Sequence, residues 1–180
     1  ADEVIIYEPC LGLKAEMLLE NNITLWNKNF TSNLVASPVD FIICRQVIEH
    51  LGDPSQMLSD IALCLRPNGT AYLEVPRAEY IFENAAIGDF HFAHVHYFTE
   101  QNFVELCRQC GLQLIRSFQL KNGHDTGFLF IRSKVKNTSL TLNRPLSIEF
   151  KTKLSERRDE CRIEFEGMQG DIAFYGATRN

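Results

Sequence analysis

The sequence predicts an α/β fold whose sheet is mostly parallel and ends in an antiparallel hairpin. Short apolar runs alternate with helical patterns over the first two thirds of the 180 residues. The strongest runs are apolar nearly throughout, as expected for strands that are covered on both faces. The stretches between them are long enough to hold the crossover helices that parallel strands require. Two later β-rich segments flank a short polar turn, which is the pattern of a hairpin.

The first predicted strands are short. Val4–Tyr7 is a continuous apolar run, and Ile23–Trp26 is a second one. Between them, Leu13–Glu20 has a helical pattern that a pair of asparagines ends. Val39–Cys44 is the clearest strand in the chain, because it is strongly apolar and follows a loop.

The next elements predict a β–α–β unit that begins with Val39–Cys44. Asp53 is suited to cap a helix, and Pro54 occupies the favoured first helical position. Apolar residues then recur at helical spacing until Leu65, where the segment Pro67-Asn68-Gly69 is expected to break the helix. Thr70–Val75 returns as a strand, and a helical crossover of this length favours parallel pairing.

The pattern changes after this unit. Residues 77–98 are rich in aromatic residues and histidines and show little periodicity. Thr99 is placed to cap a helix that runs to about Cys110. Strands at Leu112–Leu120 and Gly127–Arg132 then form the predicted hairpin.

The C-terminal quarter predicts a charged helix and the beginning of another element. Leu146–Phe165 is amphipathic, and Asp171–Gly176 has the composition of a strand. We therefore divide the chain into a partial α/β domain at residues 1–134, a linker with a helix at 135–166, and the start of a further domain at 167–180.

Composition restricts the classes of function. The net charge is -5 and the sequence pI is near 5.5, which argues against binding to a nucleic-acid backbone, because that needs a basic face. No apolar stretch approaches the roughly 18 residues that span a bilayer. The N-terminus is acidic, unlike a signal peptide. We therefore expect a cytoplasmic protein with a small-molecule substrate, without a nucleic-acid or membrane partner, and with no indication of its oligomeric state.

Several polar or aromatic residues follow predicted strands, at the edge where parallel sheets bind ligands. Glu8 ends the first strand, where a carboxylate can accept hydrogen bonds from both hydroxyls of a ribose. Asn29 and Phe30 follow the second strand, where an amide can meet the edge of an adenine and a ring can stack on its face. Arg45 and Gln46 follow the third. A helix-capping role for the acid and a core position for Phe30 are the alternatives.

The residues from Val39 to Pro54 closely resemble the Rossmann-like methyltransferases that use S-adenosyl-L-methionine. In that family an aspartate opens the fourth strand, a Glu-His-Leu element follows it, and Leu-x-Pro-x-Gly precedes the fifth strand. Here these features are Asp40, Glu49-His50-Leu51 and the segment 65–69. The resemblance implies a Rossmann-like sheet and S-adenosyl-L-methionine as cofactor. It also implies that Glu8 is the ribose-binding acid, and it places Asn29 where the family more often has an adenine-facing aspartate.

The sequence contains no GxGxG motif, although the first strand of that family ends in a glycine-rich loop that approaches the cofactor. The first strand here resembles the family's second strand. Either the chain is a fragment of a longer protein or its cofactor site is incomplete. We favour a fragment, with a sheet incomplete at its N-terminus, because both ends of the sequence look cut. We expect the chain as it stands to bind the cofactor weakly or not at all.

The segment Gly88–Thr99 resembles the histidine-rich loop of methyltransferases that act on carbon atoms of nucleotide-linked deoxysugars. Gly123–Gly127 and Tyr175-Gly176-Ala177 also resemble parts of that subgroup. The match departs from the subgroup at Ala93, which replaces a glutamate, and at His91, which replaces a tyrosine. The resemblance implies a sugar nucleotide as substrate, and the two departures fall on residues of the subgroup's histidine-rich loop.

Methyl transfer is an in-line attack that often requires removal of a proton from the nucleophile, and an imidazole suits this task. His94 is our first candidate for the base, with His91, His96 and Tyr97 as orienting or substrate-binding groups. The alternative is that these side chains pack a lid over the edge of the sheet. The pair Glu49 and His50 is interpreted as architectural, because family members with different substrates share it.

We expect no metal ion. His91, His94 and His96 are suitable ligands, but their spacing in a loop fixes no geometry, and no carboxylate or thiol is evidently paired with them. The six cysteines are interpreted as buried thiols. The CxxC at Cys107 and Cys110 lies in a helical pattern, whereas a metal or redox site there would need a turn and more ligands.

Two functions therefore remain open. The first is a methyltransferase for a small molecule, and the second is a non-catalytic domain that keeps the fold to bind a partner. A nicotinamide enzyme fits poorly, because its pyrophosphate site needs a G-x-G-x-x-G turn, and Tyr175-Gly176-Ala177-Thr178 has a single glycine.

Overall fold

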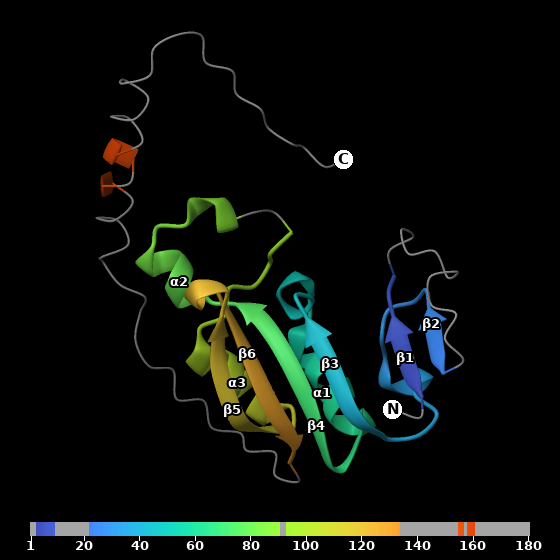
Figure 1. Ribbon diagram of the computed structural model, residues 1–180. Helices are drawn as coiled ribbons and strands as arrows, with labels where there is room; N and C mark the ends of the chain where they lie inside the picture. The colour runs from blue at the N-terminus through green and yellow to red at the C-terminus, as the bar shows by residue number, and fades with distance from the viewer. Residues whose placement is uncertain (1–2, 10–21, 91–92, 134–154, 157, 161–180) are drawn as a thin grey trace.

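Two sheets make up the fold in the computed structural model, which describes residues 3–9, 22–90, 93–133, 155–156 and 158–160 (Figure 1). The smaller sheet pairs β1 (Val4–Tyr7) with β2 (Ile23–Trp26) in parallel. The larger sheet has the order β3-β4-β6-β5. Its strands are β3 (Val39–Arg45), β4 (Leu65–Pro76), β5 (Leu112–Leu120) and β6 (Asp125–Arg132).

The larger sheet is mixed. β3 and β4 are parallel, with pairs that run from Phe41 opposite Thr70 to Arg45 opposite Glu74. β6 lies between β4 and β5 and is antiparallel to both. Three strands therefore run in one direction and β6 runs against them, which confirms the predicted α/β sheet with a C-terminal hairpin (Figure 1).

Three helices and four 3₁₀ turns connect these strands in the described part of the chain. The helices are α1 (Pro54–Cys64), α2 (Ala78–Glu83) and α3 (Glu100–Gln109). The turns are η2 (Ser32–Leu34), η3 (Ile48–His50), η4 (Ile87–Asp89) and η5 (Lys121–Gly123). Both predicted caps are present. The Asp53 carboxylate accepts hydrogen bonds from the backbone N–H groups of Ser55 and Gln56 at 3.0 and 3.2 Å, and the Thr99 hydroxyl accepts one from Asn102 at 3.1 Å.

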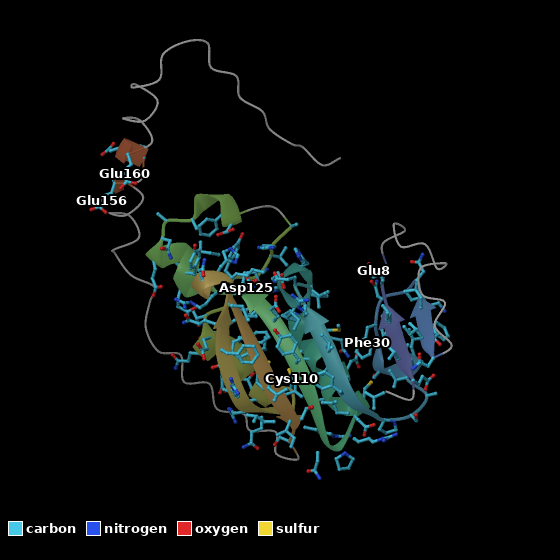
Figure 2. All side chains as sticks on the ribbon, viewed as in Figure 1. Glu8, Phe30, Cys110, Asp125, Glu156 and Glu160 are labelled. Atoms are coloured by element: carbon cyan, nitrogen blue, oxygen red, sulfur yellow. The ribbon has the colours of Figure 1, made fainter. Side chains whose placement is uncertain are left out.

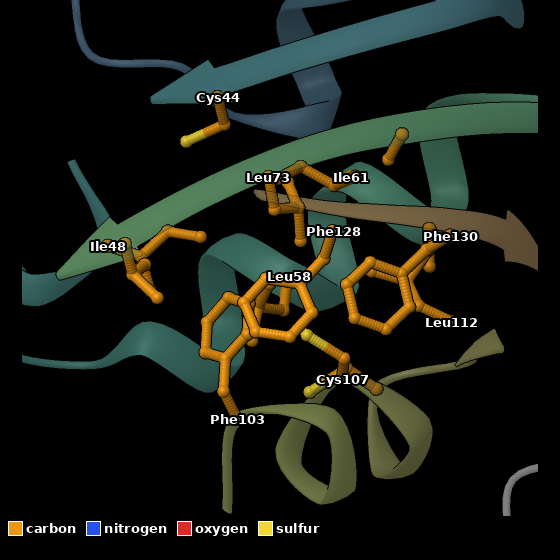
Figure 3. Close-up of a cluster of buried hydrophobic side chains, with 14 of the residues drawn as sticks. Cys44, Ile48, Leu58, Ile61, Leu73, Phe103, Cys107, Leu112, Phe128 and Phe130 are labelled. Carbon is orange, nitrogen blue, oxygen red and sulfur yellow. The ribbon is translucent and has the colours of Figure 1, made fainter. Parts of the chain in front are cut away.

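The hydrophobic core lies on one face of the larger sheet. Phe103 from α3 packs against Phe128 and Phe130 from β6, with ring centroids 5.0 and 6.3 Å apart. Leu58 and Ile61 from α1 belong to the same buried cluster, so α1 and α3 cover the same face (Figure 3). Four of the expected buried thiols are confirmed as free cysteines inside the protein: Cys44, Cys64, Cys107 and Cys110.

One predicted boundary is wrong. The helix α1 ends at Cys64, and Leu65 already pairs with Val39, so the expected helix break at residues 67–69 is the beginning of β4. This segment turns sharply, with Asn68 at a φ of 67°. Arg66 holds it against β3, because its guanidinium donates to the Pro38 carbonyl at 2.9 Å and to the Asp40 carboxylate at 2.9 and 3.0 Å.

Other predicted elements lie partly or wholly outside the described residues. They are the helix at 13–20, the strand at 171–176 and most of the helix at 146–165, of which residues 155–156 and 158–160 are helical. Within the described residues, no helix has the length and hydropathy to cross a bilayer.

Candidate functional site

The carboxyl ends of β3 and β4, the beginning of β6 and the loop at residues 93–98 meet at one edge of the larger sheet. Gln46, directly after β3, has a left-handed backbone with a φ of 52°. Its N–H donates to the Glu74 carbonyl at 3.0 Å. A non-glycine residue in this conformation stores backbone strain, which persists where the surrounding structure holds it and occurs often at functional sites.

Glu74, which is 1% exposed, is the centre of a buried polar network at this edge. The Arg45 guanidinium donates to its carboxylate at 2.8 and 3.2 Å, and the Tyr72 hydroxyl donates at 2.8 Å. The hydrogen bonds from Arg45, followed by those from Tyr72 and Gln46, outweigh burial and lower the pKa of Glu74 to about 2. Burial and the contact with Glu74 raise the pKa of Tyr72 to about 12. The carboxylate is therefore ionised at neutral pH and the phenol is neutral.

Asp125, at the beginning of β6, is fully buried and joins the same network. It accepts a hydrogen bond from the Gln46 side-chain amide at 3.1 Å and forms an ion pair with Lys121. The His124 ring lies between two carboxylates, with Nδ1 2.5 Å from Asp125 and Nε2 3.2 Å from Asp89. Burial lowers the pKa of His124, but the hydrogen bonds to Asp125 and Asp89 outweigh it and raise the pKa above the usual value of 6.5.

A second group of polar side chains forms where the loop at 93–98 crosses η3. The Glu49 carbonyl accepts hydrogen bonds from the N–H groups of Val95 and His96 at 3.0 and 3.1 Å. His50 Nδ1 lies 2.6 Å from the Ala93 carbonyl oxygen. These contacts bring the His94 ring to 4.8 Å from the His50 ring, edge to face. The Glu49 side chain is 1% exposed, and burial raises the pKa of its carboxyl.

The predicted cofactor-binding residues lie in two places. Glu8 is at the carboxyl end of β1, half-buried, and its N–H donates to the Trp26 carbonyl at 3.0 Å. Figure 2 shows Glu8 and Asp125 toward the same end of the strands. Asn29 is exposed, whereas Phe30 lies edge-on against Tyr7, with ring centroids 5.2 Å apart, and packs against the hydrophobic core.

The side chains of Arg45 and Gln46 turn toward β4 and β6, where they contact Glu74 and Asp125. The sheet therefore brings these two predicted residues together with two carboxylates, those of Glu74 and Asp125, that the sequence did not indicate as site residues.

The predicted catalytic residues form part of the loop over this edge. His94 lies between the rings of His50 and Tyr97, with centroids at 4.8 and 6.1 Å. His96 is stacked on Phe98 at 5.6 Å, so its ring packs toward the core. His91 lies outside the described residues.

A family model described as a methyltransferase domain matches residues 3–117 of this sequence, which include β1 to β4, η3 and the loop at 93–98. The chain belongs to this methyltransferase family. The predicted family resemblance is confirmed, and the sugar-methylating subgroup is a separate matter that this match does not address. No curated protein sequence is significantly similar to the chain.

Solved structures with the methyltransferase fold are similar to this chain at low identity. The N-methyltransferase NodS from Bradyrhizobium japonicum WM9, in complex with S-adenosyl-L-homocysteine, has a TM-score of 0.54 and 12% identity, over 72% of this chain and 66% of NodS. LepI in complex with S-adenosylmethionine has a TM-score of 0.57 and 18% identity, over 73% of this chain and 36% of LepI. The pyocyanin biosynthetic protein PhzM has a TM-score of 0.55 and 17% identity, over 72% and 42%. These likenesses show the fold, and the chain spans less than half of LepI and PhzM.

Proposed function

We propose that this methyltransferase domain transfers the methyl group of S-adenosylmethionine to a small molecule at the carboxyl edge of β3 and β4. The proposal rests on the groups that lie at this end of the strands. A strained residue, Gln46, follows β3, a loop with a histidine folds over it, and an acid ends β1 on the same side of the molecule. In parallel sheets this is the edge at which ligands bind.

Side chains that follow β1 and β2 support the proposal, because they suit the nucleoside part of the cofactor. The half-buried carboxylate of Glu8 suits the two ribose hydroxyls, since a carboxylate accepts paired hydrogen bonds. Asn29 is exposed and free to approach an adenine edge, and Phe30 offers a ring whose other contacts are with Tyr7 and the core. Arg45 and Gln46 lie at the same edge, but their side chains already bind Glu74 and Asp125. We therefore expect them to border the cofactor site through their backbone.

When bound, the cofactor supplies an electrophilic methyl group on a sulfonium. The loop at 93–98 would hold the acceptor near that group. We propose that His94 accepts the proton of the acceptor and that His91, His96 and Tyr97 orient it. A sugar linked to a nucleotide is the acceptor that the resemblance of the loop favours.

Calorimetry of the full-length protein with S-adenosylhomocysteine tests the cofactor site. We expect binding in the micromolar range and a loss of affinity of about 10- to 100-fold in Glu8→Gln, because a charged acceptor of two hydrogen bonds is lost. Glu3→Gln removes an exposed acid near the other end of β1 and should bind as the wild type does. Equal affinity in Glu8→Gln and the wild type would remove Glu8 from the site.

An untargeted search for methylated products, followed by kinetics on the acceptor found, tests the catalytic role. His94→Ala should lower kcat by about 10²- to 10⁴-fold and change the affinity for S-adenosylhomocysteine little. Unchanged turnover would place the base elsewhere.

The non-catalytic alternative is favoured by one observation, the engagement of Arg45 and Gln46 with buried carboxylates instead of with the cofactor side of the edge. Binding of S-adenosylhomocysteine without any methylated product would support a domain that uses the fold for recognition alone.

A further inference from the structure

Glu49, His50 and His94 converge although the sequence separates the third residue from the first two. A carboxylate oxygen of Glu49 and one ring nitrogen of each histidine all lie within 4.8 Å of one another. His50 Nε2 is already 3.7 Å from Glu49 Oε1. These three groups come from η3 and from the loop at 93–98.

The Glu49 carboxylate has no hydrogen-bond partner within the described residues. Both of its oxygens are buried, and neither accepts a hydrogen bond from that part of the chain. An ionised carboxylate buried without hydrogen bonds is strongly destabilising, unless a cation or a proton compensates it. The Glu49 carboxylate is therefore an acceptor within the cluster that has no donor among the described residues.

The tautomer of His50 is fixed in a form suited to a ligand. Its Nδ1 lies 2.6 Å from the Ala93 carbonyl oxygen, which can only accept, so Nδ1 carries the hydrogen. The lone pair of neutral His50 is then on Nε2, the nitrogen that faces Glu49. A backbone carbonyl that orients the remote nitrogen of an imidazole is the usual support of a metal-binding histidine.

The backbone holds the third group in place. Hydrogen bonds from Val95 and His96 to the Glu49 carbonyl, with the contact of His50 to Ala93, attach the loop to η3 on both sides of His94. The position of His94 is thus set by the same turn that carries the other two groups.

We propose that Glu49, His50 Nε2 and His94 bind one divalent transition-metal ion, with Zn²⁺ as the representative cation. Two imidazoles and one carboxylate suit Zn²⁺ and leave a fourth position open. Ligand atoms about 2.1 Å from a tetrahedral ion are roughly 3.4 Å apart, so shifts on the order of 1 Å close the site. The His50 side chain is 37% exposed, which leaves room for that movement.

This site revises the expectation that no metal ion binds. The sequence suggested three histidines of one loop as ligands and no carboxylate, whereas among the described residues it is His94 of that loop that lies beside Glu49 and His50. His94 can therefore act as the proposed base only in the protein without the ion, because a nitrogen of His94 that binds a metal cannot accept a proton at the same time.

Metal binding is measured on the full-length protein after treatment with a chelator, by competition between the protein and a chromophoric chelator for Zn²⁺. We expect one ion per chain, no comparable affinity for Mg²⁺, and a loss of at least roughly tenfold in Glu49→Gln, His50→Ala and His94→Ala. His96→Ala is the matched control, because it removes an imidazole of the same loop that lies outside the cluster, and it should keep the wild-type affinity. Circular dichroism checks that each variant folds. If a histidine variant does not fold, the Zn²⁺ affinity of Glu49→Gln, which preserves the shape of the side chain, decides whether the site exists.

Substitution with Co²⁺ identifies the ligand atoms. Because the chain has six cysteines, thiolates are the competing ligands, and they give a strong charge-transfer band that imidazole and carboxylate do not. Visible bands without the thiolate band support the site. A thiolate band, binding that survives Glu49→Gln unchanged, or no binding of Zn²⁺ by the wild type overturns it. These readouts need neither cofactor nor turnover, so they are independent of the proposed methyl transfer.

Discussion

The covered face of the larger sheet and its carboxyl edge are both buried, but they are buried differently. The face is filled with apolar rings, such as those of Phe103 and Phe128, which have no polar atoms that need a hydrogen-bond partner (Figure 3). The edge encloses three carboxylates, those of Glu49, Glu74 and Asp125, each at most 1% exposed. Apolar burial stabilises a fold directly, whereas buried charge must be compensated group by group.

The carboxylates at the edge are compensated to different degrees. Arg45 and Tyr72 satisfy Glu74, and Lys121, His124 and Gln46 surround Asp125. The Glu49 carboxylate receives no hydrogen bond from the described residues. The apolar face therefore stabilises the fold, whereas the edge holds buried ionisable groups with shifted pKa values. Such groups cluster at functional sites.

The largest expected effect is on the covered face. Phe103→Ala removes a fully buried ring that touches three other rings, and should reduce the free energy of unfolding by about 3–5 kcal/mol. Phe41→Ala is the control on β3, where the ring is 50% exposed, and should cost less than about 1 kcal/mol. Denaturation in urea measures both. Similar losses in the two variants would mean that the face covered by α1 and α3 is not the main core.

An intermediate effect is expected at the edge in acid. The hydrogen bonds from Arg45 lower the folded pKa of Glu74 to about 2, from 4.5. The contact therefore stabilises the protein fully above about pH 4.5, and this stabilisation disappears as the pH falls toward 2. Because Arg45 is 57% exposed, solvent screens the contact, and we expect it to contribute on the order of 1–2 kcal/mol.

Unfolding by urea at several pH values from 6 to 2 detects this loss. The wild type should lose more stability over this range than Glu74→Gln, and Glu83→Gln, which removes an exposed carboxylate from α2, should follow the wild type. An identical slope in the wild type and Glu74→Gln would show that the buried contact does not hold the carboxylate ionised.

The smallest expected effect concerns His124. Its hydrogen bonds with Asp125 and Asp89 overcome burial and raise its pKa, so the stability they add is complete below pH 6.5 and is lost as the pH rises through the raised pKa. Asp89→Asn should move the pKa of His124 back toward 6.5, as followed by NMR titration of the ring. Glu83→Gln again serves as the control. If the pKa of His124 does not change in Asp89→Asn, the Asp89 carboxylate does not contribute to raising it.

Much of the fold could be predicted because it is specified locally. Asp53 followed by proline begins α1, and Thr99 begins α3, as their sequence patterns indicate. The hairpin between β5 and β6 follows from a turn in which Asn122 and Gly123 have positive φ angles, 56° and 89°. The end of α1 could not be placed, because Leu65 is apolar in either a helix or a strand, and its pairing with Val39 decides the outcome.

The site could be predicted only in part, because its contacts are not local. The histidine loop was recognisable, and so were the residues after β1 and β3. Gln46 contacts Asp125 across 79 positions of the chain, and His50 contacts Ala93 across 43. Glu74 looks like an ordinary polar residue in a strand until the sheet places Arg45 beside it. A single sequence carries no signal for such pairs.

The most direct test of the central claim is a crystal structure of the full-length protein with S-adenosylhomocysteine. We predict one nucleoside at the carboxyl edge, with its ribose hydroxyls on the Glu8 carboxylate and its sulfur beside the Gln46 backbone. A ligand bound away from this edge, or one that touches either residue without reaching the other, would contradict the proposed site.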